Sequence, residues 1–354
     1  MFYQKLLKPI LFKFDPENVH DFFVWAGEVL GKFGLSRKLV ALFYRYKGPD
    51  ISIIVDGISF KTPFILSAGF DYNARLINIL PEISFGSVEV GSVTARPCLG
   101  NDKPRLIRLP KSKSILVRKG LRNEGVDAVI HRLKKYCIKK DFVVGVSIAQ
   151  TNDEKNCSAE TGLEDYLYSF KRLNEENVGD YYTVNISCPN AFGGEAFAKP
   201  ALLDLLVSRL SAIRCEKPVY VKMPINLEWS EFDNLLKVLN KFEIIKGVII
   251  GNLNKEYNSL DYRNEAPDEY RGGLSGKPCF ELSNNLIRKT RSAYGKRFTI
   301  IGCGGVLSPL DMAQKFAAGS DLVALITGMI YNGPSLVKLL SSYYANHLIK
   351  QNGK

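Results

Sequence analysis

The sequence predicts an α/β protein in which a closed (β/α)8 TIM barrel follows a small helical extension. Two observations favour this fold. After residue 49, eight short apolar runs alternate with segments of helical periodicity, as expected for parallel strands joined by helices. Before that point the pattern is helical, without a strand signal. We therefore expect an N-terminal amphipathic helical pair over residues 1–48 and a barrel over residues 49–354.

The helical extension opens with a helix-start signal. The Asp-Pro-Glu sequence at residues 15–17 places a capping side chain before a proline in the first turn. An apolar stripe follows over residues 19–33, Gly34 is the expected stop, and a second stripe covers residues 35–43. Lysines and arginines flank both stripes. These helices either pack on the rest of the protein, which is the usual role of an apolar stripe, or lie on an anionic membrane surface.

The strand pattern of the remaining chain predicts parallel pairing. The expected strands are continuous apolar runs, which suits strands buried on both faces. They cover residues 64–68, 87–90, 143–148, 182–186, 219–223, 247–250, 299–302 and 322–326, with helices such as 202–213, 229–242 and 309–317 between them. A closed barrel accounts for eight such strands. A doubly wound open sheet is the alternative, but no G-x-G-x-x-G motif opens a helix after the first strand.

Composition narrows the classes of function. Hydrophobic residues make up 46% and charged residues 24% of the 354 residues, which excludes a disordered or collagen-like chain. The net charge of +12 is spread along the chain, which favours an anionic surface or ligand over nucleic acid. Seven cysteines without a C-x-x-C pair and only three histidines argue against a disulfide framework and a metal site, so we expect a reducing compartment. We expect neither a transmembrane helix nor a signal peptide.

Glycine-rich and polar loops follow the expected strands, at the barrel end where active sites lie. Glycines let backbone N–H groups approach an anion closely. Such loops stand at residues 69–73, 91–94, 187–190, 251–252, 302–305 and 327–328, and a Gly-rich segment at 272–276 comes just before the last two. One loop alone indicates a tight turn, but several at one barrel face indicate a phosphate-bearing cofactor. Lys222, inside an expected strand, either extends outward or faces a negatively charged group on that cofactor, and we favour the second.

Several of these motifs resemble the dihydroorotate dehydrogenases. They are Asn-Ile-Ser-Cys-Pro-Asn at 185–190, Gly-Gly-Leu-Ser-Gly at 272–276 and Gly-Cys-Gly-Gly at 302–305. The segments at 15–20 and 100–105 are similar to the quinone-dependent, membrane-associated class of that family. The resemblance extends from about residue 2 to residue 338. It implies an FMN-binding barrel and an N-terminal helical pair that forms an apolar tunnel for a quinone.

The resemblance also implies residue roles. Residues that line FMN would be Ala68, Gly69, Ser92, Ser147, Asn185, Lys222, Gly251, Ser275, Gly276, Gly304, Gly305, Ile326, Thr327 and Gly328. The backbone amides of Gly304, Gly305, Thr327 and Gly328 would hold its phosphate. Substrate-binding residues would be Tyr72, Asn185, Asn190, Asn252 and Leu253. Asparagine offers both a donor and an acceptor to a ring that bears N–H and C=O groups. His20 and Arg108 would lie at the quinone tunnel, although His20 can equally be a capping or packing residue.

The expected catalytic base is Cys188, in the loop after the fourth strand. It would remove the proton from C5 of dihydroorotate while a hydride leaves C6 for the flavin. A thiol has an ordinary pKa of about 8.5, nearer neutrality than a hydroxyl, so it needs less activation. Outside such a motif a cysteine is often only a small buried apolar residue. The quinone-dependent class carries serine here, and cysteine is typical of the soluble classes.

The substrate side departs from the family pattern at three more positions. Tyr72 stands where the quinone-dependent class has a lysine that contacts the substrate carboxylate, Val117 replaces an asparagine, and Leu253 replaces a threonine. Burying a carboxylate without a cation or donors costs several kcal/mol. Either a cation elsewhere compensates, or the substrate is a different reduced ring. The candidate cations are Arg118, Lys119 and Arg122.

We therefore expect a peripheral membrane enzyme that oxidises dihydroorotate to orotate in pyrimidine (UMP) biosynthesis and passes the electrons to a quinone. In a bacterium it would lie on the cytoplasmic face of the inner membrane. Its expected partners are the substrate, the quinone and the membrane surface, with no nucleic acid and no metal. The alternatives are a related FMN oxidoreductase that acts on another reduced ring, and a non-catalytic FMN-binding protein.

Overall fold

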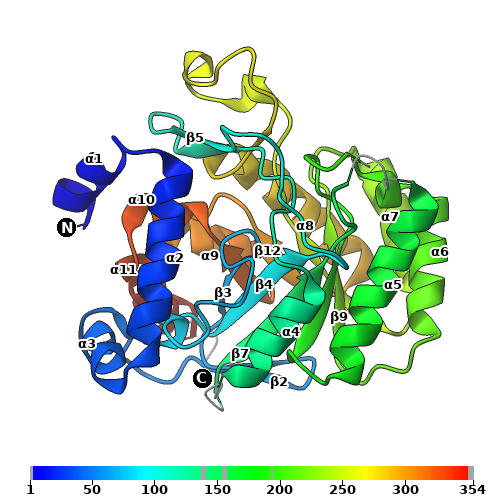
Figure 1. The fold of residues 1–354 in the computed structure, drawn as a ribbon, viewed down its shortest axis with the longest axis horizontal. Coiled ribbons are helices and arrows are strands. Elements are labelled where there is room, and N and C mark those ends of the chain that lie inside the picture. Colours follow the sequence, from blue (N-terminus) through cyan, green and yellow to red (C-terminus); the bar gives the residue numbers. More distant parts are fainter. Residues whose placement is uncertain (1–2, 137–140, 154–157, 193, 350–354) are drawn as a thin grey trace.

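The computed structural model describes residues 3–136, 141–153, 158–192 and 194–349, and its centre is a closed barrel of eight parallel strands (Figure 1). The predicted fold class is confirmed, and the eight expected strands all occur with small differences at their ends. Around the barrel the order is β10, β12, β13, β3, β4, β7, β8, β9. Their bounds are β3 Phe64–Leu66, β4 Ser87–Val93, β7 Val143–Ile148, β8 Tyr181–Asn185, β9 Val219–Met223, β10 Ile245–Ile250, β12 Thr299–Cys303 and β13 Leu322–Leu325.

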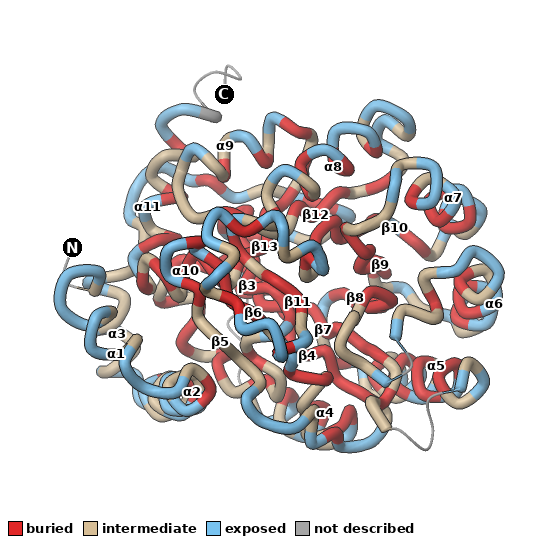
Figure 2. Tube along the Cα trace, turned by 90° about the horizontal axis from the view of Figure 1, so that it is seen from above, coloured by how far each residue is buried: buried red, intermediate tan, exposed pale blue. Residues whose placement is uncertain are grey.

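Helices form the outer layer of the barrel, and Figure 2 shows them around the buried strands, with exposed residues on their outer faces. They are α4 Val126–Lys135, α5 Ala159–Glu175, α6 Pro200–Ser211, α7 Trp229–Asn240, α8 Phe280–Tyr294, α9 Pro309–Ala317, α10 Thr327–Asn332 and α11 Ser335–Tyr343. Short 3-10 helices cover Leu80–Ile83, Ala196–Ala198, Tyr257–Ser259, Arg263–Glu265 and Lys277–Cys279, and a π-helical turn covers Tyr344–Ile349. The apolar stripes of the helices face the strands because burial there removes them from water.

The N-terminal region is helical, as the periodicity predicts. A π-helical turn over Tyr3–Leu7 leads into α1 Lys8–Leu11, and α2 Pro16–Lys32 and α3 Gly34–Tyr44 follow. Asp15 caps α2, since its Oδ1 accepts from the Asn18 backbone N–H at 2.8 Å. The expected stop at Gly34 is wrong by one residue: Phe33 takes the extended conformation between the helices, and Gly34 begins α3.

One face of the helical extension packs on the barrel, as the first interpretation of the apolar stripes predicts, and another face stays exposed. Val24 on α2 joins the main buried core, and Gly27 on the same helix lies against Leu76 and Ile79, so one face packs on the barrel. Other apolar side chains stay in solvent: Trp25 is 56%, Leu35 73% and Phe43 66% exposed. None of the helices within the described ranges is both long and apolar enough to cross a membrane.

The end of the barrel where the strands begin is sealed by a hairpin that the strand analysis did not anticipate. β1 Ile53–Val55 pairs with β2 Ile58–Phe60 in antiparallel fashion. Phe60 packs in one buried cluster with the rings of Tyr181 and Tyr220, which point into the barrel from β8 and β9. The Tyr220 hydroxyl donates to Asp56 Oδ2 at 2.7 Å. This half of the barrel interior is therefore filled by side chains.

A second unanticipated sheet stands at the opposite end. β5 Leu106–Leu109, β6 Ser114–Val117 and β11 Gly273–Leu274 form a three-stranded antiparallel sheet. It has a small apolar core of its own, which includes Leu116 and Tyr270. Figure 2 shows these strands above the barrel opening. The sheet therefore adds a wall to whatever site the strand ends enclose.

Candidate active site

The carboxyl ends of the strands and the helical extension enclose a continuous cavity. Its larger part, of about 530 Å³, is lined by α1 and α2, by the loops after β3 and β4, and by β5 and β6. A smaller part, of about 90 Å³, lies against the loops after β12 and β13. The two parts adjoin, because both are lined by Ala68, Lys222, Asn252, Leu253, Ser275, Ile326 and Thr327. The cavity thus runs from the barrel mouth to the helical extension.

Backbone groups dominate the smaller part. Gly304 and Gly305 have φ angles of 99° and 79°, and a Cβ atom at Gly305 would lie 2.4 Å from Cβ of Phe280. Only glycine fits this turn without displacing its neighbour. Thr327, at the start of α10, lines the same space, and its Oγ1 donates to Ser275 Oγ at 2.8 Å. A concave surface of backbone N–H groups of this kind suits a phosphate.

The floor of the cavity is a buried polar chain. Asn185 Nδ2 donates to Ser92 Oγ at 2.8 Å, and that hydroxyl lies 2.8 Å from Ser147 Oγ. Lys222 stands opposite Asn185 in the parallel register of β8 and β9. Its side chain lines the cavity, is only 5% exposed, and donates from Nζ to Ser67 Oγ at 3.3 Å. The expected inward lysine is present, and it faces the cavity.

A buried carboxyl lies in the electrostatic environment of Lys222. Burial raises the pKa of Glu89, and the positive charge of Lys222 opposes that rise. Glu89 Oε2 accepts from Thr183 Oγ1 at 3.0 Å, while Oε1 has no partner among the described residues. Because Lys222 lines the cavity and donates only weakly to Ser67, its ammonium can also face an electron-rich ligand edge.

Three asparagine amides reach the cavity from different loops, and their orientations are fixed. Asn190 Nδ2 donates to the Val117 carbonyl at 2.9 Å, and Asn252 Nδ2 donates to Ser187 Oγ at 2.6 Å. Asn185 is fixed by its bond to Ser92. A ligand in this space therefore meets amides in defined positions rather than free rotors.

Cys188 lines the larger part of the cavity next to these amides. Burial raises the pKa of its thiol to about 11, and a backbone hydrogen bond from Asn190 and the charge of Lys222 only partly oppose this. Desolvation of the thiolate outweighs the nearby positive charge, so this site opposes the easy deprotonation that the ordinary thiol pKa suggests.

The end of the cavity under the helices is apolar, with two polar side chains from the predicted set. His20 Nε2 lies 2.9 Å from the Phe70 carbonyl oxygen, so the ring joins α2 to the loop after β3. Arg108 on β5 donates from Nη1 to the Phe14 carbonyl at 2.8 Å, and its guanidinium lies 4.7 Å from the Phe12 ring centroid. Burial lowers the pKa of Arg108. Both residues line the cavity.

The comparisons with known proteins agree on one family. The family model for dihydroorotate dehydrogenase matches residues 51–346. The chain belongs to the dihydroorotate dehydrogenase family. It is 37% identical over 346 residues to a dihydroorotate dehydrogenase (quinone) of Christiangramia forsetii, covering 95% of this chain and 96% of that one. It is 34% identical to the protein of the same name from Shewanella frigidimarina, covering 97% and 99%. A crystal structure of DHODH from Eimeria tenella with ferulenol matches with a TM-score of 0.82 and 26% identity, covering 96% and 93%.

Compared with the pattern expected of this family, the altered substrate-side residues lie together. Tyr72, Val117 and Leu253 all line the larger part of the cavity. The half-buried ring of Tyr72 lies between two neighbours: the His20 ring centroid lies 5.3 Å away, and Lys119 Nζ lies 4.9 Å from the Tyr72 centroid. The position where the family has a lysine therefore touches a lysine that comes from another loop.

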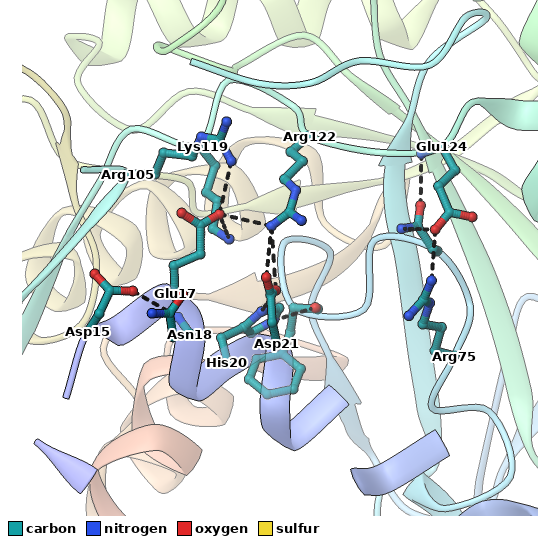
Figure 3. Close-up of polar contacts among 12 residues, drawn as sticks. Asp15, Glu17, Asn18, His20, Asp21, Arg75, Arg105, Lys119, Arg122 and Glu124 are labelled. Atoms are coloured by element: carbon teal, nitrogen blue, oxygen red, sulfur yellow. Dashed lines mark hydrogen bonds and ion pairs between the residues drawn. The ribbon is translucent and has the colours of Figure 1, made fainter. Parts of the chain in front are cut away.

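That lysine belongs to an ion cluster that sequence reasoning missed. Arg105, Lys119 and Arg122 contact the same oxygen, Oε1 of Glu17, at 3.1, 3.1 and 3.0 Å (Figure 3). Burial acts to raise the pKa of Glu17, but the charges and hydrogen bonds of Lys119 and Arg105 outweigh it, so the pKa lies below its ordinary value. Arg122 also contacts Asp21 Oδ2 at 3.1 Å. Glu17 lies about a hundred residues before its three cationic partners in the sequence, so no local pattern indicates these ion pairs.

The structure brings the predicted site residues together around the cavity, and Ser147 is the exception. The residues proposed for cofactor, substrate, base and quinone line the two parts of the cavity, apart from Ser147. Ser147 is fully buried behind Ser92 and reaches the cavity only through that hydroxyl. Ser67, Cys279 and Cys303 line the smaller part without having been predicted. Cys303 lies within a glycine loop, and Ser67 and Cys279 lie within three residues of one, so their place in the sequence was the available signal.

Proposed function

We propose that this protein oxidises dihydroorotate to orotate with bound FMN and transfers the electrons to a quinone. A single observation carries the proposal: Cys188, the fixed amides, Lys222 and the double-glycine loop line a cavity that continues to the helical extension. The family relationship supplies the reaction. The cavity supplies a place for a phosphate at one end, a small ring beside the thiol, and an apolar molecule under the helices.

The residues present fit FMN. The backbone groups of Gly304, Gly305, Thr327 and Gly328 would hold the phosphate, since all four residues line the smaller part of the cavity and a Cβ atom at any of the three glycines would collide with a neighbouring residue. Lys222 would stand at the electron-rich edge of the ring system, where its positive charge favours added electron density. Asn185 and Ser92 would hydrogen-bond the ring, and Ser147 would orient Ser92. Bound FMN supplies the acceptor for the hydride that leaves C6 of dihydroorotate.

In this proposal Cys188 is the general base. Its thiolate removes the proton from C5 of the substrate, and the thiol then holds that proton. Asn190 and Asn252 orient the substrate ring, because both side chains line the cavity and their Nδ2 groups are held by Val117 and Ser187. Since burial raises the pKa of Cys188 to about 11, the reactive thiolate is a minor species at neutral pH, and its population rises with pH.

We also propose that residues 1–48 form the quinone-binding part and rest on a membrane as a peripheral attachment. Phe22, Trp25, Leu35 and Phe43 are exposed on α2 and α3, and basic residues such as Lys32, Arg37 and Lys38 stand near them. Exposed aromatic residues beside basic ones suit the surface of an anionic bilayer. In a bacterium this would be the cytoplasmic face of the inner membrane.

An anaerobic reduction experiment tests the proposal. The purified protein is expected to carry flavin absorbance, which dihydroorotate should bleach and a soluble quinone analogue should restore. A yellow protein that other reduced rings bleach, but dihydroorotate does not, would assign another substrate. A colourless protein that takes up no added FMN would overturn the flavoenzyme proposal altogether.

A further inference from the structure

The proposed substrate brings a carboxylate into the cavity, and the expected lysine is absent. Tyr72 stands at that position, and Val117 and Leu253 add no hydrogen-bond donors from their side chains. A carboxylate bound here needs a cation or several donors within the cavity wall. The candidate cations Arg118, Lys119 and Arg122, which follow β6, differ in whether their side chains reach the cavity.

Lys119 is the candidate that the structure places at the cavity. Its side chain is buried, at 7% exposure for the residue, and lines the cavity together with Cys188 and Asn190. Its ammonium lies 4.9 Å from the centroid of Tyr72, the residue that occupies the family's lysine position. Arg118 is exposed and does not line the cavity. Arg122 lines it, but its Nη1 contacts both Glu17 and Asp21.

The charges around Lys119 favour a further anion. In the contacts of the described chain, the cations Arg105, Lys119 and Arg122 meet only the carboxylates of Glu17 and Asp21. All three cations use the same oxygen of Glu17, so each shares it with two others. The cluster therefore carries one excess positive charge at the cavity wall, and a bound carboxylate would neutralise it.

We infer that Lys119 binds the substrate carboxylate in this protein, in place of the lysine that the family carries at position 72, and that Glu17 of α2 positions the Lys119 ammonium. This inference rests on the proposed function. The cation thus comes from the loop after β6 instead of the loop after β3. The two positions are neighbours, because Lys119 Nζ lies against the ring of Tyr72. Tyr72 fills the vacated place with a ring that lies beside the ammonium.

The test measures ligand binding by the FMN-loaded protein. Isothermal titration gives dissociation constants for orotate and for uracil, which has the same ring without the carboxylate. Lys119→Met should weaken orotate binding about 100-fold and change uracil binding less than threefold, because only orotate uses the ammonium. Flavin content should stay unchanged. Lys119→Gln, which can still donate to Glu17, gives the same comparison should the Met variant fold poorly.

A matched control and an exchange complete the design. Arg105→Gln removes a cation that contacts the same Glu17 oxygen but does not line the cavity, so orotate binding should stay within threefold. The double variant Tyr72→Lys/Lys119→Tyr returns the ammonium to the family position and should bind orotate at least tenfold more tightly than Lys119→Met.

The outcomes separate this inference from the proposed function. If dihydroorotate bleaches the wild-type flavin but Lys119→Met and Lys119→Gln bind orotate within threefold of wild type, the inference fails and the proposed function stands. Equal losses of orotate and uracil affinity would also overturn it, since they indicate damage to the site rather than a lost carboxylate contact. If the wild-type flavin is not bleached, the proposed function fails and the inference with it.

Discussion

The two ends of the cavity differ in what would hold a ligand. At the β12 and β13 end, backbone N–H groups and glycines such as Gly304 and Gly305 form the surface. At the end facing α2 and β6, side chains such as Tyr72 and Lys119 form it. The fold itself fixes a backbone group, whereas a side-chain function can move to another loop that faces the same space. This explains why the family pattern persists at one end and is altered at the other.

The largest expected effect comes from a substitution at the end of the cavity formed by backbone groups. Gly305→Ala should yield protein without flavin, with FMN affinity lowered at least about 100-fold, because its Cβ would meet Cβ of Phe280 at 2.4 Å and its φ is 79°. Absorbance of the purified protein measures the flavin content. Gly295→Ala is the control: φ there is also positive, at 55°, but an added Cβ meets nothing within 4 Å. Full flavin content in Gly305→Ala would contradict the backbone assignment.

The next effect concerns the thiol between the two ends. Because the pKa of Cys188 is about 11, the thiolate fraction and hence the rate of flavin reduction by dihydroorotate should rise about tenfold per pH unit between about pH 6 and 9. Cys188→Ala should slow this reduction by about 10²–10⁴-fold and flatten its pH profile. Anaerobic stopped-flow absorbance measures both. Cys215→Ala, away from the cavity, is the control, and an unchanged rate in Cys188→Ala would remove that residue from the mechanism.

A smaller effect should distinguish the role of the helical extension in quinone turnover from the role of the barrel in flavin reduction. Ala26→Trp adds bulk to the face of α2 that lines the cavity, so quinone turnover should fall about tenfold or more while flavin reduction by dihydroorotate stays unchanged. Steady-state turnover in detergent with a quinone analogue is compared with single-turnover reduction. Trp25→Ala changes the neighbouring residue on the exposed face and should leave both rates intact. Parallel losses in both reactions would argue against separate entry of the quinone.

The smallest effect is on stability at acid pH. The folded-state pKa of Glu17 lies below its ordinary value, so its charge stabilises the fold above about pH 4, and this contribution is lost as pH falls through the folded pKa. Glu17→Gln should lower the melting temperature by about 2 °C or more at neutral pH, with the difference shrinking toward pH 3. Thermal unfolding at several pH values measures it. Asp268→Asn, at an exposed pair, is the control.

The strands could be predicted from sequence because parallel barrel strands are buried on both faces and form continuous apolar runs. The sheet of β5, β6 and β11 could not, since its strands are short and partly exposed and one of them lies some 150 residues from the others. The hairpin of β1 and β2 could not be predicted either, because its strands are also short.

The residue types of the site and the loops that carry them could be predicted from sequence. The pKa of the thiol and the cation that faces the cavity could not. The glycine loops and the asparagines follow strand ends, so the barrel topology alone brings them together. The pKa of Cys188 depends on how completely surrounding side chains remove water, which no local pattern contains. The choice among Arg118, Lys119 and Arg122 depends on which side chain turns inward. Only the contacts of Glu17 and Tyr72 decide it.

The hairpin and the tyrosine layer beneath the barrel have a practical consequence. Because Phe60, Tyr181 and Tyr220 fill that half of the interior, reactants and products must all come and go by the rim at the strand ends. The sealed base is thus free for attachment. A fluorophore or surface tether at Ile54, which is 75% exposed on the hairpin, would immobilise the molecule with its entrance pointing away from the support.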